Sequence, residues 1–185
     1  MGSHAYRSKG PKNEVRVTLD ALRQIVRALR LSSTVAEKSH GVSGAQLFVL
    51  QTLGEGPAHS IAELAARTLT DPSSVSVVVK RLTEHGLVAR RQSKRDARRA
   101  ELALTKKGEG VVRAAPQAAQ AVLIDALAAL SPAMRRSLAR ALTALVQNMG
   151  GASEPPVLFF EESATTDTTP RKSSRSAGSR HRALS

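Results

Sequence analysis

The chain has 185 residues, which suits one domain with tails or two small domains, and it carries a formal net charge of +13. Such an excess of positive charge favours an anionic partner, with nucleic acid ahead of an anionic membrane surface. The chain contains no cysteine, so disulfides and thiolate catalysis are excluded. No apolar run reaches the roughly 18 residues of a membrane-spanning helix, and the first residues lack the apolar core of a signal peptide. We therefore expect a cytoplasmic protein.

The first part of the chain predicts a flexible arm followed by a long helix. Residues 1–14 are polar and contain Gly10 and Pro11, as loose segments do. From residue 17 to about residue 38, apolar residues recur at three-and-four spacing, with Leu22 early in the pattern. This spacing is typical of an amphipathic helix.

Two shorter helices are predicted next from their capping residues. Ser43 and Gln46 have the spacing of a capping box before the apolar run LFVLQTL, and Gly54 follows as a C-terminal cap. Ser60 and Glu63 repeat the capping-box spacing at the start of SIAELAART. Each pair therefore predicts the first turn of a helix.

A fourth helix is predicted after Asp71, which is a suitable N-cap. Pro72 suits the first helical position, because proline lacks an N–H that would have no partner there. The valines that follow favour strands, but their spacing is helical and Gly86 can end the helix. The residues on the shared apolar face are Val75, Val78, Val79 and Leu82. Two short helices joined by a brief turn predict a helix-turn-helix.

A charged hairpin follows. The stretches LVARRQ and AELALT flank a basic loop over residues 93–99, and Leu102 and Leu104 alternate with their neighbours as in a half-buried strand. A helix-turn-helix followed by such a hairpin is a winged helix, here about residues 43–105. Six of the ten residues from 90 to 99 are Lys or Arg. Because like charges repel, this concentration favours a polyanionic partner over the alternative of a solubilising hairpin.

The remaining chain predicts two further helices and a tail. Residues 106–130 are rich in alanine and predict one helix, and Ser131 with Pro132 starts another. An apolar stripe follows that last helix up to Gly150 and Gly151: Met134, Leu138, Leu142, Leu145 and Met149. Residues 150–185 are rich in Ser and Thr and have no evident core, so we expect a disordered tail.

Residues 17–149 resemble the multiple antibiotic resistance regulator (MarR) family of winged-helix transcription factors. The similarity rests on SGAQLFVLQTL, SIAELAARTLTDPSSVSVVVKRLTEHGLVAR and above all DARRAELALTKKG. The last stretch matches the wing signature of the family at Asp96, Arg98, Leu102, Leu104, Thr105 and Gly108. The resemblance implies a mainly α fold, in which a winged helix-turn-helix with a two-stranded β wing is joined to N- and C-terminal dimerisation helices. Leu22 and the apolar stripe of the last helix would then hold a homodimer together, through helices at about 17–38 and 106–149.

The resemblance also implies a function. Family members are dimeric, bind double-stranded DNA at pseudo-palindromic operators and typically repress transcription, and many release DNA when a small aromatic or phenolic anion binds. No residue pattern here names a pocket for such an effector. The alternative is a promiscuous architectural protein of the nucleoid, because the arms and tail are basic. We expect no enzyme, metal or cofactor, since the histidines lack metal-ligand spacing and no catalytic constellation is present.

The start of the fourth helix supplies the predicted base contacts. Serine hydroxyls can donate or accept, a valine can contact a thymine methyl group, and a lysine can reach phosphate or guanine. The residues predicted for this face are Ser73, Ser74, Ser76, Val77 and Lys80. Arg81 is expected to contact backbone phosphate. A solvated helix face is the alternative interpretation.

The wing supplies the remaining predicted contacts, by resemblance to the family. Arg98 would enter the minor groove, where a narrow groove concentrates negative potential, and Asp96 would orient this arginine or its neighbours. Phosphate contacts are expected from Lys94, Arg95 and Arg99. Arg90 and Arg91 lie on the strand, where one of the two would face DNA.

Overall fold

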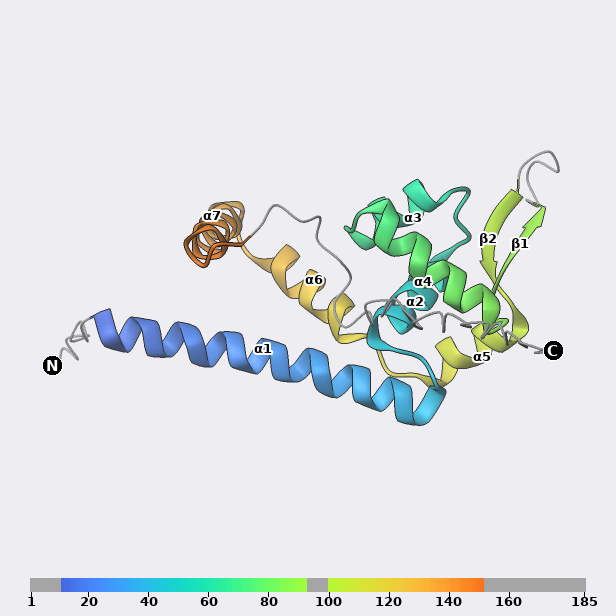
Figure 1. Cartoon of the computed structure of the whole chain (residues 1–185), viewed down its shortest axis with the longest axis horizontal. Helices are drawn as coiled ribbons and strands as arrows, with labels where there is room; N and C mark the ends of the chain where they lie inside the picture. Colours follow the sequence, from blue (N-terminus) through green and yellow to red (C-terminus); the bar gives the residue numbers. More distant parts are fainter. Residues whose placement is uncertain (1–10, 93–99, 152–185) are drawn as a thin grey trace, which may run out of the picture.

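The computed structural model describes residues 11–92 and 100–151, and within these ranges it contains seven helices and one two-stranded sheet (Figure 1). In chain order the elements are α1 (Pro11–His40), α2 (Gly44–Glu55), α3 (Ile61–Thr68), α4 (Pro72–Glu84), β1 (Val88–Gln92), β2 (Ala100–Leu104), α5 (Lys106–Ala114), α6 (Ala119–Ala129) and α7 (Pro132–Asn148). The predicted fold class, mainly helical with a two-stranded wing, is confirmed. The wing lies at one end of the molecule, and α7 and the start of α1 lie at the other.

The core lies inside the winged helix. Apolar side chains of α2, α3 and α4 meet those of the wing, and the most deeply buried of them include Leu47, Leu50, Leu64, Val75, Val78, Leu82 and Val88. The two strands pair antiparallel, from Val88 opposite Leu104 to Gln92 opposite Ala100. Ala58 adds a short bridge to the outer edge of β2, because its N–H and C=O both bond to Leu102, at 3.0 and 2.7 Å. The wing is therefore attached to the loop before α3.

Most of the predicted helix caps are present. The capping box of α2 is complete: Ser43 Oγ accepts from the N–H of Gln46, and Gln46 Oε1 accepts from the N–H of Ser43. At α3 the prediction is only half right, because Ser60 caps the helix but the carboxylate of Glu63 accepts from the N–H of His59. α2 itself extends one residue past Gly54, to Glu55.

Two predicted boundaries are wrong. α1 begins at Pro11, so residues 11–14 are helical, whereas their composition predicts a flexible arm. Proline suits a first helical turn, and Glu14 in that turn interacts favourably with the helix dipole, so a segment with Pro11 can start a helix as well as break one. The single helix predicted over residues 106–130 is two helices, since residues 115–118 are extended. Pro116 explains the break: it has no N–H and restricts the residue before it to extended conformations.

The last helix starts and stops as predicted. Ser131 Oγ accepts from the N–H of Met134, Pro132 occupies the first turn, and Gly150 adopts a left-handed φ of 73° just beyond the helix. None of the described helices is long and apolar enough to cross a membrane.

Candidate nucleic-acid interface

The start of α4 presents an open polar face. Ser73, Ser76 and Lys80 are exposed, and Val77 keeps 40% of its surface accessible. Meanwhile Val75, Val78, Val79 and Leu82 turn inward and fix the helix on the core. Four of the five residues predicted as base contacts therefore share one accessible side of the helix.

The fifth residue, Ser74, is buried instead. It is only 5% exposed, its hydroxyl donates to Asp71 Oδ2 at 2.7 Å, and its N–H donates to Asp71 Oδ1 at 3.1 Å. Ser74 precedes Val78 by four residues, so helical spacing places it on the buried face of the helix. Its hydroxyl supports the Asp71 cap of α4, so Ser74 does not share the accessible face of the helix and its contact with DNA stays a prediction.

Asp71 organises this end of the helix. The hydroxyl of Ser73, then that of Ser74, and the N–H groups of both residues donate to its carboxylate and lower its pKa from 3.8 to about 2. The carboxylate is therefore ionised at neutral pH. Because the hydroxyl proton of Ser73 points at Asp71, its oxygen offers lone pairs outward, which suits the amino group of adenine or cytosine.

The two wing arginines that the structure describes are both exposed and differ in surroundings. Arg91 Nη2 donates to the carbonyl oxygen of Leu104 at 3.1 Å, so this side chain lies along its own hairpin. Arg90 borders a recess of about 180 Å³ together with His59 and Glu101. The predictions for Lys94, Arg95, Asp96, Arg98 and Arg99 fall in residues 93–99, outside the described ranges. Arg81 is partly buried in α4, and its phosphate contact stays a prediction.

Glu101 was not singled out from the sequence. It is only 6% exposed, and its Oε2 lies 4.0 Å from Nδ1 of His59, on the loop that pairs with β2. The alternation along β2 predicts a solvent-facing residue at this position. The bridge from Ala58 covers that side of the strand, and no local sequence pattern indicates a contact made by a distant loop.

Contacts between elements hold α4 at its far end. Lys107 Nζ donates to the carbonyl oxygen of His85, and Thr105 Oγ1 donates to that of Gly86, at 3.0 and 2.7 Å. Gly108 lies so close to the same loop that an added Cβ would stand 2.1 Å from the carbonyl oxygen of Leu87. Thr105, Lys107 and Gly108 therefore fix the end of α4 against the start of α5.

Arg67 performs a similar task for the first helix of the helix-turn-helix. Its guanidinium donates to the carbonyl oxygens of Gly56, at 2.8 Å, and Thr52. These acceptors lie at and just beyond the C-terminal end of α2, where a cation interacts favourably with the helix dipole. The side chain thus ties α3 to α2.

The predicted dimerisation residues lie on exposed surface in the single chain. No residue of α7 is buried, and the stripe of Met134, Leu138, Leu142, Leu145 and Met149 is open to solvent. Leu22 is partly covered and borders a shallow groove along α1 with Leu19 and Val26. Contiguous apolar surface of this kind marks a contact with another molecule.

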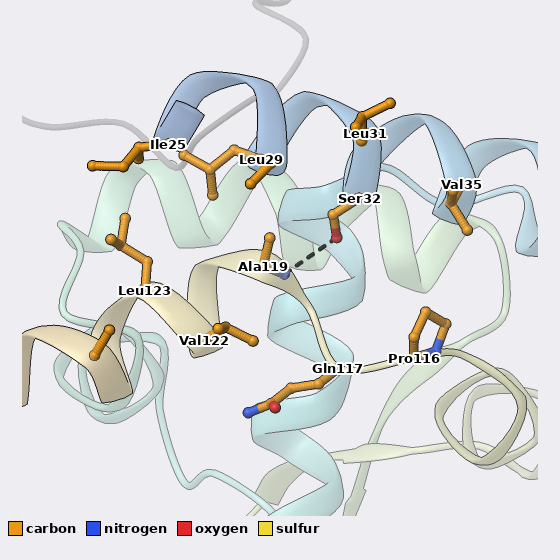
Figure 2. A pocket seen from close by; sticks show the side chains of 12 residues that line it. Ile25, Leu29, Leu31, Ser32, Val35, Pro116, Gln117, Ala119, Val122 and Leu123 are labelled. Atoms are coloured by element: carbon orange, nitrogen blue, oxygen red, sulfur yellow. Dashed lines mark hydrogen bonds between the residues drawn. The ribbon is translucent and has the colours of Figure 1, made fainter. Parts of the chain in front are cut away.

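A second groove separates α1 from α6 (Figure 2). It has a volume of about 470 Å³ and receives apolar side chains from both helices, among them Ile25, Leu29, Val35, Val122 and Leu123. Ser32 and Gln117 are the polar residues among those that line it, and none of the lining residues is charged. Within the described residues, no group of three or more His, Asp or Glu side chains could hold a metal ion.

The chain is similar to one protein family and to one curated protein. The MarR family model matches residues 40–99. The HTH-type transcriptional repressor MdtR of Bacillus subtilis (strain 168) is 33% identical over 97 residues, which are 52% of this chain and 61% of MdtR. The chain thus spans about 61% of the length of that curated relative.

Several solved structures are similar to the chain. A MarR family protein from Bacillus stearothermophilus is 24% identical with a TM-score of 0.46, covering 77% of this chain and 99% of its own. BpsR of Bordetella bronchiseptica, whose DNA binding is regulated by 6-hydroxynicotinic acid, is 24% identical with a TM-score of 0.44, covering 80% and 98%. Residues 40–99 are thus similar to the MarR family, and 97 residues of the chain are similar to the repressor MdtR.

Proposed function

We propose that the protein is a dimeric, sequence-specific regulator of transcription that represses its targets by binding double-stranded DNA. The observation that carries this proposal is the exposed face of α4, where Ser76, Val77 and Lys80 stand clear of the core. Residues 80–99 contain eight Lys or Arg residues and only Glu84 and Asp96 as acids. Double-stranded DNA would fit both features, because it is a polyanion and its major groove accepts an α-helix.

The dimer in this proposal forms through α1, α6 and α7. The exposed stripe of α7 and the exposed apolar residues in the first half of α1, which include Val15, Val17 and Leu19, supply two apolar surfaces of the same chain. A twofold dimer would bury both in each copy and place two recognition helices about one DNA turn, roughly 34 Å, apart. The operator should then be pseudo-palindromic, and the protein should work in the cytoplasm on the nucleoid.

Footprinting on the DNA upstream of its own gene tests the proposal. We expect one protected pseudo-palindrome with a dimer bound, and affinity should fall steeply with salt because each neutralised phosphate contributes about 0.9 to the log–log slope. Continuous protection without sequence preference would instead support the architectural protein. A monomer with one protein per site, measured by sedimentation, would contradict the dimeric regulator.

Arg98→Ala tests the part assigned to the wing. Binding to the operator should weaken by about 1–3 kcal/mol, the range of a contact directed at the bases. Arg113→Ala is the matched control, since Arg113 is an exposed arginine on α5 that pairs with Glu109 of its own helix. An Arg98→Ala protein with unchanged affinity and salt slope would remove this residue from the interface.

A small aromatic acid is the proposed effector that relieves repression. The groove between α1 and α6 supports a ligand whose ring fills apolar space, with Ser32 and Gln117 as its polar neighbours. The ligand must favour a dimer whose recognition helices are wrongly spaced for DNA, and a tenfold release requires about 1.4 kcal/mol of differential binding. Aromatic carboxylates and phenols can be screened by thermal shift and then for DNA release. If none does both, control by protein abundance alone replaces this proposal.

A further inference from the structure

The segment that joins the winged helix to α6 depends on two other helices for its hydrogen bonds. Residues 115–118 are extended, with φ and ψ of −84° and 145° at Ala115 and −62° and 134° at Ala118. The N–H of Ala115 still donates to the carbonyl oxygen of Val111 and the carbonyl oxygen of Ala118 accepts from the first turn of α6, but the backbone groups between these ends need partners elsewhere. Pro116 fixes one φ angle in this segment but offers no N–H.

Gln51 of α2 supplies two of these partners. Its Nε2 donates to the carbonyl oxygen of Pro116, and its Oε1 accepts from the N–H of Ala118, both at 2.8 Å. The side-chain amide thus pairs with the joining segment as the backbone of a neighbouring strand would, using a donor and an acceptor together. Ala118 is fully buried at this contact, so the segment is held against the core of the winged helix.

Ser32 of α1 supplies a third hydrogen-bond partner, at the start of α6. The N-cap of α6 is Ala118, whose methyl group cannot accept a hydrogen bond. Instead, Ser32 Oγ accepts from the N–H of Ala119 at 3.2 Å, as Figure 2 shows. The first turn of α6 is therefore capped by a serine from another helix, where an N-cap serine of its own would ordinarily do this.

From these contacts we infer that Gln51 and Ser32 are positioning residues that form a clasp on the joint between the winged helix and α6. The clasp sets the direction in which α6 leaves the winged helix. α7 follows α6 and buries none of its own residues in the chain, so this direction determines where the stripe of α7 meets a second copy. This inference rests on the proposed dimeric function: the clasp fixes the spacing of the two recognition helices in the dimer.

The absence of cysteine makes the spacing measurable. In a Glu84→Cys reporter protein, a single spin label per chain can be attached at the exposed end of α4. Double electron–electron resonance spectroscopy then measures the distance between the two labels of a dimer. We expect one narrow distance distribution in the reporter protein and a broad one when Gln51→Ala and Ser32→Ala are added. Thr34→Ala is the matched control, because Thr34 is an exposed hydroxyl residue on the same helix as Ser32.

The preference for half-site spacing gives a second readout. It is the ratio of the affinity for the operator to the affinity for duplexes whose half-sites are moved by one base pair. The unsubstituted protein should prefer the native spacing, and the double variant should lose roughly tenfold of that preference, which three neutral hydrogen bonds of ordinary strength can supply. A purely structural role would lower the melting temperature and leave the preference unchanged. If the double variant fails to fold, Gln51→Glu replaces it, since a carboxylate still accepts from Ala118 but cannot donate to Pro116.

The outcomes separate this inference from the proposed function. If the unsubstituted protein is a monomer or ignores half-site spacing, the proposed function fails and the clasp inference fails with it. If that protein is dimeric and spacing-selective while the folded clasp variant keeps the same distance distribution and the same preference, the clasp inference alone is wrong.

Discussion

The winged helix and the helices outside it (α1, α6 and α7, the outer helices) have similar apolar content but bury it to different extents. Eight of the 12 residues of α2 are buried, whereas none of the 17 residues of α7 is. α1 combines both behaviours, because its second half packs Leu29 and Ala36 inward and its first half exposes Val15 and Leu19. The difference teaches that the apolar face of a helix does not by itself predict burial within its own chain. The core lies mainly within the winged helix, and in the proposed dimer a second copy would cover the apolar faces that the outer helices expose.

Leu142→Glu should have the largest effect, because it places a charge on the exposed apolar face of α7. A charge in the middle of the α7 stripe must be desolvated in the dimer, and each buried leucine that is lost costs about 1.5–3 kcal/mol. We expect a monomer by sedimentation at micromolar protein, with the helical circular dichroism of the winged helix retained. Gln147→Glu adds a charge to α7 off the stripe and should leave the dimer intact. A dimeric Leu142→Glu protein would remove α7 from the interface.

Gly108→Ala should have the next largest effect, now inside the winged helix. The new Cβ would meet the carbonyl oxygen of Leu87 at 2.1 Å, and accommodating it should cost about 1–3 kcal/mol of the free energy of unfolding. Gly110→Ala, two residues along α5 with open space around it, should instead stabilise by up to about 1 kcal/mol. Urea denaturation at one protein concentration measures both. Equal effects of the two substitutions would contradict the close approach at Gly108.

Asp71 should make the cap of α4 sensitive to acid, in contrast to the serine cap of α7. Its pKa is about 2 in the folded protein and 3.8 unperturbed, so its stabilising effect is complete above about pH 4 and is lost as the pH falls towards 2. Asparagine keeps an accepting oxygen but loses the charge, so thermal denaturation should show Asp71→Asn slightly below the unsubstituted protein at pH 6, with the gap narrowing at pH 2.5. A gap that stays constant between these pH values would assign the loss to packing, not to charge.

Leu69→Gly should produce the smallest change, and in the stabilising direction. Leu69 ends α3 with a left-handed φ of 54° and is 71% exposed, so it pays a conformational cost without burying its side chain. Relief of that cost, about 1–2 kcal/mol, should slightly exceed the roughly 0.5–1 kcal/mol lost to glycine entropy. A small rise in melting temperature is expected. A fall would mean that the entropy lost by glycine outweighs the relief of the left-handed conformation.

The sequence predicted the parts of the fold that local chemistry determines. The caps at Ser43, Asp71 and Ser131 each place an oxygen next to free N–H groups, and all three helices start where these residues stand. The outward face of α4 followed from its valine spacing. For Ser74 the polar side chain was given more weight than its four-residue distance from Val78, which correctly indicates burial.

Other features depend on distant parts of the chain. The alanines around Pro116 have a high helical propensity and predict one helix across this position. The missing N–H of this proline is nevertheless enough to end a helix. Burial of Glu101 depends on the bridge from Ala58, and the groove between α1 and α6 depends on how two separate helices meet. No local periodicity carries that information, so these features emerged only from the structure.

The external capping of α6 has a consequence for the order of folding. The N–H groups of its N-cap Ala118 and its first residue Ala119 have partners 67 and 87 residues earlier in the chain, at Gln51 and Ser32. Closing loops of that length is entropically costly, and a short helix without its cap is marginal in water. We expect α6 to form after α1 and α2 have packed together, so that the amides of Ala118 and Ala119 gain protection from hydrogen exchange later than those of α2. Newly made chains would thus acquire the ability to pair only once the DNA-reading unit is complete.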